Sequence, residues 1–249
     1  MRTFLINLDV NKDRMSFVDA QLRRCGMVYE RIPGVDGAVM PLAERKKCVN
    51  RFRWWCAVGR PATAAEIGCA LSHYCIYKRM IDEKIPTALI FEDDVLLSDV
   101  IKSGVRVAEK FLSGATPQVL LFSNHDGMPY ERMGVAAFVE NGITVMRSRS
   151  GICADGYCLN LEAAKALLRQ NFPMIVPCDH WWRWVSNGTI ELYHVLPSAV
   201  VQNQCKFGSS TSMERLKTLT PMSAKWFLHK AKRLAGKPLD WLMSGIFDK

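Results

Sequence analysis

One short segment constrains the fold of this chain more than any other. Residues 87–91, Thr-Ala-Leu-Ile-Phe, predict a buried strand, and three consecutive acids at residues 92–94 follow it directly. The segment before it predicts a long helix, because Thr63 and Glu66 have the spacing of a capping box and helical periodicity continues to about Glu83. A helix that leads into a buried strand is a building unit of α/β folds.

The same alternation continues along the chain. Asn141-Gly142 between apolar runs is a strong signal for a two-residue hairpin turn. The basic and aromatic stretch 45–60 is expected to be a surface loop or a mobile segment. Further strands are predicted at residues 3–8, 118–123, 151–159 and 189–195, and further helices at residues 16–25, 99–112 and 161–170. Strands alternating with helices predict an α/β fold with a central, mainly parallel sheet.

At 249 residues the chain fits one α/β domain. We expect this domain to cover residues 1–222 and a basic, amphipathic helical tail to cover residues 223–249. The first residues lack the apolar length and the cleavage site of a signal peptide. No stretch has the roughly 18–20 apolar residues of a membrane span. The sequence therefore predicts a cytoplasmic protein.

Nine cysteines, an odd number, are spread along the chain. None forms a C-x-x-C pair, and several lie in apolar runs, where cysteine acts as a small hydrophobic residue. This pattern is typical of a reducing compartment and predicts no structural zinc site.

The net charge is +9, and such an excess attracts polyanions, which include nucleic acid, anionic lipid and phosphorylated acceptors. The basic residues are spread out, and no recognised nucleic-acid-binding motif is present. Nucleic acid is therefore not an expected partner.

The acids at residues 92–94 carry the strongest chemical signal. Adjacent carboxylates repel one another, and burial disfavours their ionised form. A divalent cation that prefers hard oxygen ligands relieves both effects. Ligands of open α/β sheets bind at the carboxyl ends of strands, which is where these acids lie. The alternative is a solvated acidic turn.

These residues resemble glycosyltransferase family 25, the lipopolysaccharide and lipooligosaccharide glycosyltransferases. Leu89-Ile90-Phe91-Glu92-Asp93-Asp94-Val95 is similar to the E-D-D signature of that family. Other motifs of the family are matched in the same order over about residues 3–211, at Ile6-Asn7-Leu8 with Arg14, Val35-Asp36-Gly37, Glu66-Ile67-Gly68-Cys69 with Leu71-Ser72-His73, Gly156-Tyr157, and Pro177-Cys178-Asp179. Ala65 stands where the family usually has glycine.

The resemblance implies a GT-A-like fold, a nucleotide-sugar donor, a Mn²⁺ or Mg²⁺ ion and inversion at the transferred sugar carbon. It makes Asp94 the first metal ligand, with Glu92 as a second ligand; Glu92 or Asp93 can instead hold the ribose or a metal-bound water. Asn7 and Asp36 would lie near the uracil and the ribose. The implied donor-binding residues are Asn7, Leu8, Arg14, Asp36, Gly68, Ser72, His73, Glu92, Asp93 and Gly156. His73 can equally be a helix histidine with structural partners.

Asp179 is the candidate catalytic base, because an inverting transfer needs one group to take the proton of the acceptor hydroxyl. It matches the acid of the family's P-V-D motif, and nearby tryptophans can stack on sugar faces. Alternatively, the tryptophans form core packing and Asp179 caps the next helix. A third metal ligand stays open: relatives often carry a histidine shortly after the proline that matches Pro197, whereas residues 201–206 contain none and His194 precedes the proline.

The expected reaction is transfer of galactose from UDP-galactose to a lipid-linked acceptor in lipopolysaccharide or lipooligosaccharide synthesis. UDP-glucose is the alternative donor, since no motif separates the two sugars. Residues 224–242 alternate basic residues with Trp, Phe and Leu, which suits either a helix on the anionic inner membrane or one packed on the domain. A metal-dependent phosphohydrolase or nuclease would need a second acid cluster, and none is apparent. A nucleic-acid-binding protein is a third class.

Overall fold

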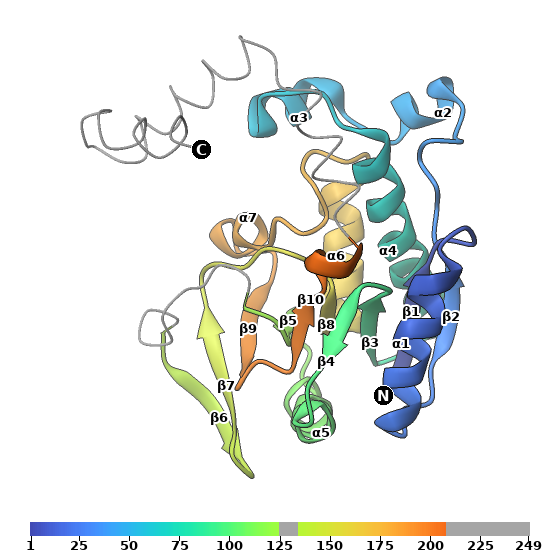
Figure 1. The fold of residues 1–249 in the computed structure, drawn as a ribbon. Helices are drawn as coiled ribbons and strands as arrows, with labels where there is room; N and C mark the ends of the chain where they lie inside the picture. The colour runs from blue at the N-terminus through green and yellow to red at the C-terminus, as the bar shows by residue number, and fades with distance from the viewer. Residues whose placement is uncertain (125–133, 208–249) are drawn as a thin grey trace, which may run out of the picture.

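The computed structural model describes residues 1–124 and 134–207, and its centre is one eight-stranded sheet (Figure 1). The strand order is β2 (Glu30–Pro33), β1 (Arg2–Asn7), β3 (Thr87–Glu92), β8 (Gly156–Asn160), β5 (Gln118–Leu121), β9 (Glu191–Leu196), β7 (Ile143–Ser148) and β6 (Ala136–Glu140). Strands β8 and β7 run opposite to the others. The prediction of an α/β fold with a mainly parallel sheet is confirmed.

Helices cover both faces of this sheet. The helices are α1 (Lys12–Arg24), α2 (Leu42–Lys47), α3 (Arg51–Val58), α4 (Ala64–Asp82), α5 (Ile101–Phe111), α6 (Leu161–Asn171), α7 (Trp181–Ser186) and α8 (Gln204–Phe207). Alternate residues of a strand point to opposite faces. Accordingly, Ile90 packs in one hydrophobic cluster with α4 and α6, whereas Leu89 and Phe91 pack in a second cluster with α1 and α5.

Helix α4 starts where the sequence predicts. The side chain of Thr63 accepts a hydrogen bond from the backbone of Glu66, and the Glu66 carboxylate accepts one from the backbone of Thr63. Arg60 then holds the same carboxylate with two hydrogen bonds, of 2.8 and 2.6 Å. This buried, doubly bonded pair fixes the start of the helix that carries four residues of the site described below.

The hairpin prediction is also confirmed, because β6 and β7 are joined at Asn141-Gly142, whose φ angles of 49° and 76° are both positive as a type I′ turn requires. Two boundaries differ from the predictions. Helix α1 begins at Lys12 rather than near residue 16, and the strand expected over 151–159 is β8, which begins only at Gly156.

The expectation of a loop over residues 45–60 is wrong. The segment forms α2 and α3, and the side chain of Asn50 caps α3 by accepting a hydrogen bond of 3.1 Å from the backbone of Arg53. Trp54 and Val58, one helical turn apart, enter the core, and Trp54 is only 1% exposed. Exposed cations such as Lys46, Arg51 and Arg53 outnumber these two buried residues, which makes the short apolar stripe hard to recognise in the sequence.

The short strands β4 (Val95–Leu97) and β10 (Val200–Gln202) pair antiparallel next to the main sheet. Neither was predicted from the sequence. The pairing brings residues 200–202 against the segment that follows the acids at the end of β3.

No helix within residues 1–124 and 134–207 is long and apolar enough to cross a membrane. The expected tail at residues 223–249, and its boundary at residue 222, lie outside the described residues.

Candidate active site

A cavity of about 320 Å³ opens at the carboxyl ends of the parallel neighbours β1 and β3. It lies where open α/β sheets bind ligands. Residues from the end of β1, the loop 34–38, helix α4 and the end of β3 surround it. Of the donor-binding residues predicted from the sequence, those that line it are Asn7, Leu8, Arg14, Asp36, Ser72, His73, Glu92 and Asp93.

Asp93 is held from two sides. Asn7 donates a hydrogen bond of 2.7 Å to its Oδ2, and Arg14 on α1 donates one of 3.2 Å to its Oδ1. Asn7 in turn accepts a hydrogen bond of 3.0 Å from Arg31. Burial raises the pKa of Asp93 above its ordinary value, although these donors oppose the rise. The buried Asn7 side chain is therefore committed to Asp93 and Arg31.

Asp94 is the acid of this group whose ionised form the surroundings disfavour most. It is only 4% exposed, and its Oδ2 accepts hydrogen bonds from Arg14 at 3.3 Å and from Gln202 at 3.2 Å. Its Oδ1 is buried and has no hydrogen-bond partner among the described residues. Burial, and next the charge of Glu92, raise the pKa of Asp94 to about 7. A buried oxygen without a donor is a place for a cation.

Glu92 turns towards α4. Its Oε1 lies 3.0 Å from Nε2 of His73 and 3.7 Å from Sγ of Cys69. Burial alone would raise the pKa of Glu92, but the hydrogen bond and charge of His73 lower it below its ordinary value. Burial alone would lower the pKa of His73, but its contacts with Cys69 and Glu92 raise it. His73 and Glu92 thus form an ion pair, and Nδ1 of His73 lies 2.8 Å from the hydroxyl of Tyr157. His73 therefore has the partners expected of a structural histidine, and it also lines the cavity.

Two glycines let the loop 34–38 lie directly on α4. A Cβ atom on Gly68 would come within 2.3 Å of the carbonyl oxygen of Val35, and one on Gly37 within 1.9 Å of the carbonyl oxygen of Ala64. Ser72 accepts a hydrogen bond of 2.8 Å from the backbone of Val35. Gly68 therefore shapes the cavity by allowing this contact and does not line it.

Gly156 and Asp179, also predicted as site residues, do not line the cavity. Gly156 pairs with Phe91 of β3, and a Cβ atom on it would come within 2.8 Å of the Val200 side chain. Asp179 is half-buried just before α7, and its Oδ1 is buried with no hydrogen-bond partner among the described residues. Trp181 and Trp184 are core residues, whereas Trp182 is 37% exposed. The packing interpretation of the tryptophans is right for two of the three.

The sequence analysis missed Gln202 as a neighbour of Asp94. His194, the only histidine considered there for the third metal ligand, is buried between the carbonyl oxygens of Ser123 and Ser150, at 3.1 and 3.2 Å. Gln202 on β10 reaches Asp94 instead, and its amide also carries a hard oxygen of the kind that Mg²⁺ and Mn²⁺ accept. The pairing of β10 with β4 places it there, and no sequence motif marks that pairing.

Comparisons with known proteins point to one family. A model of "Glycosyltransferase family 25 (LPS biosynthesis protein)" matches residues 1–182. Procollagen galactosyltransferase 2 of Homo sapiens is 26% identical over 184 residues, which are 72% of this chain and 29% of that protein. A glycosyltransferase 25 family member of Drosophila melanogaster is 25% identical over 189 residues, 72% of this chain and 30% of that protein. This chain thus spans under a third of the length of these relatives.

Among solved structures, a UDP-glucose pyrophosphorylase complexed with UDP-glucose aligns with a TM-score of 0.41 and 12% identity, over 92% of this chain and 99% of that one. The sheet observed here and the family match together confirm the predicted fold class, a GT-A-like α/β domain.

Proposed function

The chain belongs to glycosyltransferase family 25, and from this premise we propose that it transfers a hexose from a UDP-sugar to a glycan acceptor, with a divalent cation at Asp94. The observation that carries the proposal is the buried Oδ1 of Asp94 at the carboxyl end of β3, which has no hydrogen-bond partner in the described part of the chain and lies beside a cavity that polar side chains line. The cavity volume of about 320 Å³ lies within the range of small-molecule sites.

The residues around Asp94 fit a hard cation. Asp94 would hold Mn²⁺ or Mg²⁺ through Oδ1. Gln202, whose amide nitrogen donates to Asp94 Oδ2, is a candidate for the third ligand if its amide turns to bring the oxygen to the ion. Glu92 is directed at His73, so its role as second ligand would require that pair to open. When bound, such an ion supplies Lewis-acid stabilisation of the diphosphate leaving group.

The chain's own residues would position the donor. Asp36 lines the cavity from the loop 34–38, where a carboxylate can accept hydrogen bonds from ribose hydroxyls. Asn7 is committed to Asp93, so we propose that it orients that acid instead of reading the uracil. Arg14, which bridges Asp93 and Asp94, keeps positive charge beside the site of the diphosphate.

Asp179 remains our candidate for the base. Its Oδ1 is buried and has no hydrogen-bond partner among the described residues, which suits proton transfer. The residue before it, Cys178, has its Sγ 3.8 Å from Sγ of Cys69 on the cavity wall. This contact supports a position of Asp179 near the donor cavity. Inversion at the sugar carbon would require Asp179 to lie on the face of the sugar opposite the diphosphate.

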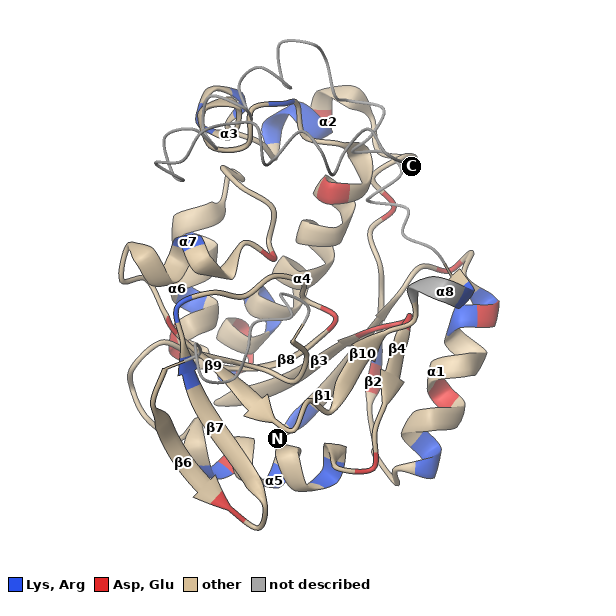
Figure 2. Cartoon of the chain, turned by 60° about the vertical axis from the view of Figure 1, so that its left-hand side comes forward, with Lys and Arg blue, Asp and Glu red and all other residues tan. Residues whose placement is uncertain are grey.

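A second cavity supports an anionic acceptor. It has a volume of about 470 Å³ and lies between α2, α3 and the start of α4. Arg45, Lys46 and Arg51 line it together with Trp55, and no Asp or Glu of the described residues does. None of these three cations has an ion-pair partner within the described parts of the chain, and Figure 2 shows the basic residues gathered on α2 and α3. Cations beside aromatic rings suit a phosphorylated or acidic sugar.

We propose galactose as the sugar, because the relatives include procollagen galactosyltransferases, and a lipopolysaccharide-type acceptor, because the family description names that synthesis. UDP-glucose stays the alternative donor. A lipid-linked acceptor would place the protein on the cytoplasmic face of the inner membrane.

A donor screen tests the proposal. Release of UDP is measured for UDP-galactose, UDP-glucose and other nucleotide sugars, with Mn²⁺, with Mg²⁺ or with chelator, and with phosphorylated or neutral oligosaccharide acceptors. Metal-dependent turnover of one UDP-hexose, stimulated by the anionic acceptors, is expected. Absence of turnover with every UDP-sugar in the presence of both metals would refute it.

A further inference from the structure

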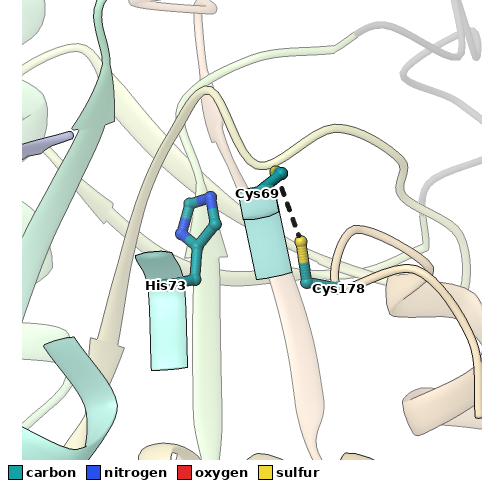
Figure 3. A group of neighbouring side chains, drawn as sticks. All are labelled: Cys69, His73 and Cys178. Atoms are coloured by element: carbon teal, nitrogen blue, oxygen red, sulfur yellow. Dashed lines mark hydrogen bonds between the residues drawn. The ribbon is translucent and has the colours of Figure 1, made fainter. Parts of the chain in front are cut away.

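Two cysteines and a histidine meet beside the candidate active site. Cys69 and His73 lie one turn apart on the same face of α4, and Cys178 comes from the segment before α7 (Figure 3). Candidate ligand atoms of the three residues all lie within 4.8 Å of one another. Glu92 adds a carboxylate oxygen 3.7 Å from Cys69 Sγ and 3.0 Å from His73 Nε2.

The spacing of these atoms is close to that of a tetrahedral zinc site. With Zn–S distances of about 2.3 Å, two sulfur ligands at the tetrahedral angle lie about 3.8 Å apart, and a sulfur and a carboxylate oxygen about 3.6 Å apart. The Sγ atoms of Cys69 and Cys178 are 3.8 Å apart, and Glu92 Oε1 is 3.7 Å from Cys69 Sγ. The third of these separations, 3.0 Å between His73 Nε2 and Glu92 Oε1, would have to widen by a few tenths of an ångström.

The surroundings resemble the outer shell of a zinc site. A zinc-binding histidine usually donates its second ring N–H to a fixed partner, which orients the ring. Nδ1 of His73 lies 2.8 Å from the hydroxyl of Tyr157, and that hydroxyl lies 2.6 Å from the hydroxyl of Tyr77. His73 is 1% and Cys178 is 7% exposed, whereas Cys69 lines the donor cavity, which gives a metal ion access from solvent.

We propose that Cys69, His73, Cys178 and Glu92 form a zinc site, and that zinc bound there competes with the nucleotide sugar. The ligand set of two sulfurs, one imidazole and one carboxylate favours zinc over the hard cation proposed at Asp94. Both cysteines bind as thiolates and release their protons to solvent. The competition rests on the proposed function, because Cys69 and Glu92 line the cavity assigned to the donor. The zinc site itself is independent of that function.

Zinc affinity is measured on the full chain, metal-free and reduced with a phosphine, by competition with a chromophoric zinc chelator. Cys178→Val removes one ligand from a residue that does not line the donor cavity, and Cys75→Ser on the exposed side of α4 is the matched control. We expect one zinc per chain, unchanged affinity in the control, and a loss in Cys178→Val of at least about 10–100-fold, the loss that removing an outer-shell partner alone causes. Equal affinity in Cys178→Val and the wild type would overturn the site.

Cobalt titration of the wild type needs no variant. A thiolate-to-cobalt charge-transfer band with intense tetrahedral d–d bands is expected, and their absence would also overturn the site. In a third measurement, zinc should weaken UDP-galactose binding in the presence of Mg²⁺ in the wild type but not in Cys178→Val. Unchanged binding in the wild type would refute the competition, whereas a zinc-binding chain that never binds any UDP-sugar would refute the proposed function alone.

Discussion

Replacing Asp94 by Asn should change the pH dependence of stability in the metal-free protein. The folded-state pKa of Asp94 is about 7 against an ordinary value of 3.8, because burial and the charge of Glu92 disfavour its ionised form. A raised acid pKa means that the folded protein binds the proton more tightly than the unfolded chain. Its stabilising effect is therefore present at low pH and is lost as the pH rises from about 4 to about 7. Between pH 5 and pH 8 this loss amounts to about 2–3 kcal/mol.

Asparagine does not titrate, so Asp94→Asn escapes this loss. The difference in unfolding free energy between Asp94→Asn and the wild type should shift by about 2–3 kcal/mol in favour of the variant between pH 5 and pH 8. That shift corresponds to roughly 4–12 °C in Tm for a chain of this size. Any hydrogen bonds to Arg14 and Gln202 that the variant loses enter at both pH values and largely cancel.

The assay is thermal or urea unfolding in chelator at both pH values, with Asp82→Asn as the control, since Asp82 is an exposed acid. The control should follow the wild type within about 0.5 kcal/mol. If the curves of Asp94→Asn and the wild type differ by the same amount at pH 5 and pH 8, Asp94 does not titrate near neutrality and our reading of its environment is wrong.

Three further substitutions test other parts of the account. Gly68→Ala should push the loop 34–38 away from α4, cost about 1–3 kcal/mol of stability and weaken UDP binding. Gly114→Ala, whose added Cβ meets open space, should change neither stability nor UDP binding. Unfolding measures the stability of the two variants, and calorimetry measures their UDP binding. Asp179→Asn should lower the transfer rate at saturating donor by about 10²–10⁴ with UDP affinity unchanged, and a normal rate would leave it as a structural residue. Trp54→Ala should lower the unfolding free energy by about 3–5 kcal/mol, which an exposed loop residue would not do.

The part of the site that adjacent parallel strands build was predictable from the sequence. Asn7 ends β1 and Asp93 follows β3, so the register of the two strands brings them to a 2.7 Å contact. Other contacts depend on pairings that leave no local signal. Gln202 meets Asp94 through the three-residue strand β10, and Cys178 meets Cys69 across 109 positions of sequence.

Helix α3 was mistaken for a loop for a different reason. Its buried apolar residues are only Trp54 and Val58, and the cations that precede them, among them Arg51 and Arg53, dominate the composition of the segment. A helix of two turns shows too few periods for its pattern to stand out from the charges around it.

The central claim is that a divalent cation at Asp94 holds the nucleotide part of the donor at the carboxyl end of β3. Titration calorimetry with UDP tests it most directly, on the wild type and on Asp94→Asn, each with Mn²⁺ and with chelator. The account predicts that Mn²⁺ strengthens UDP binding to the wild type and has no such effect on the folded Asp94→Asn protein. An equal Mn²⁺-dependent gain in both proteins would contradict it.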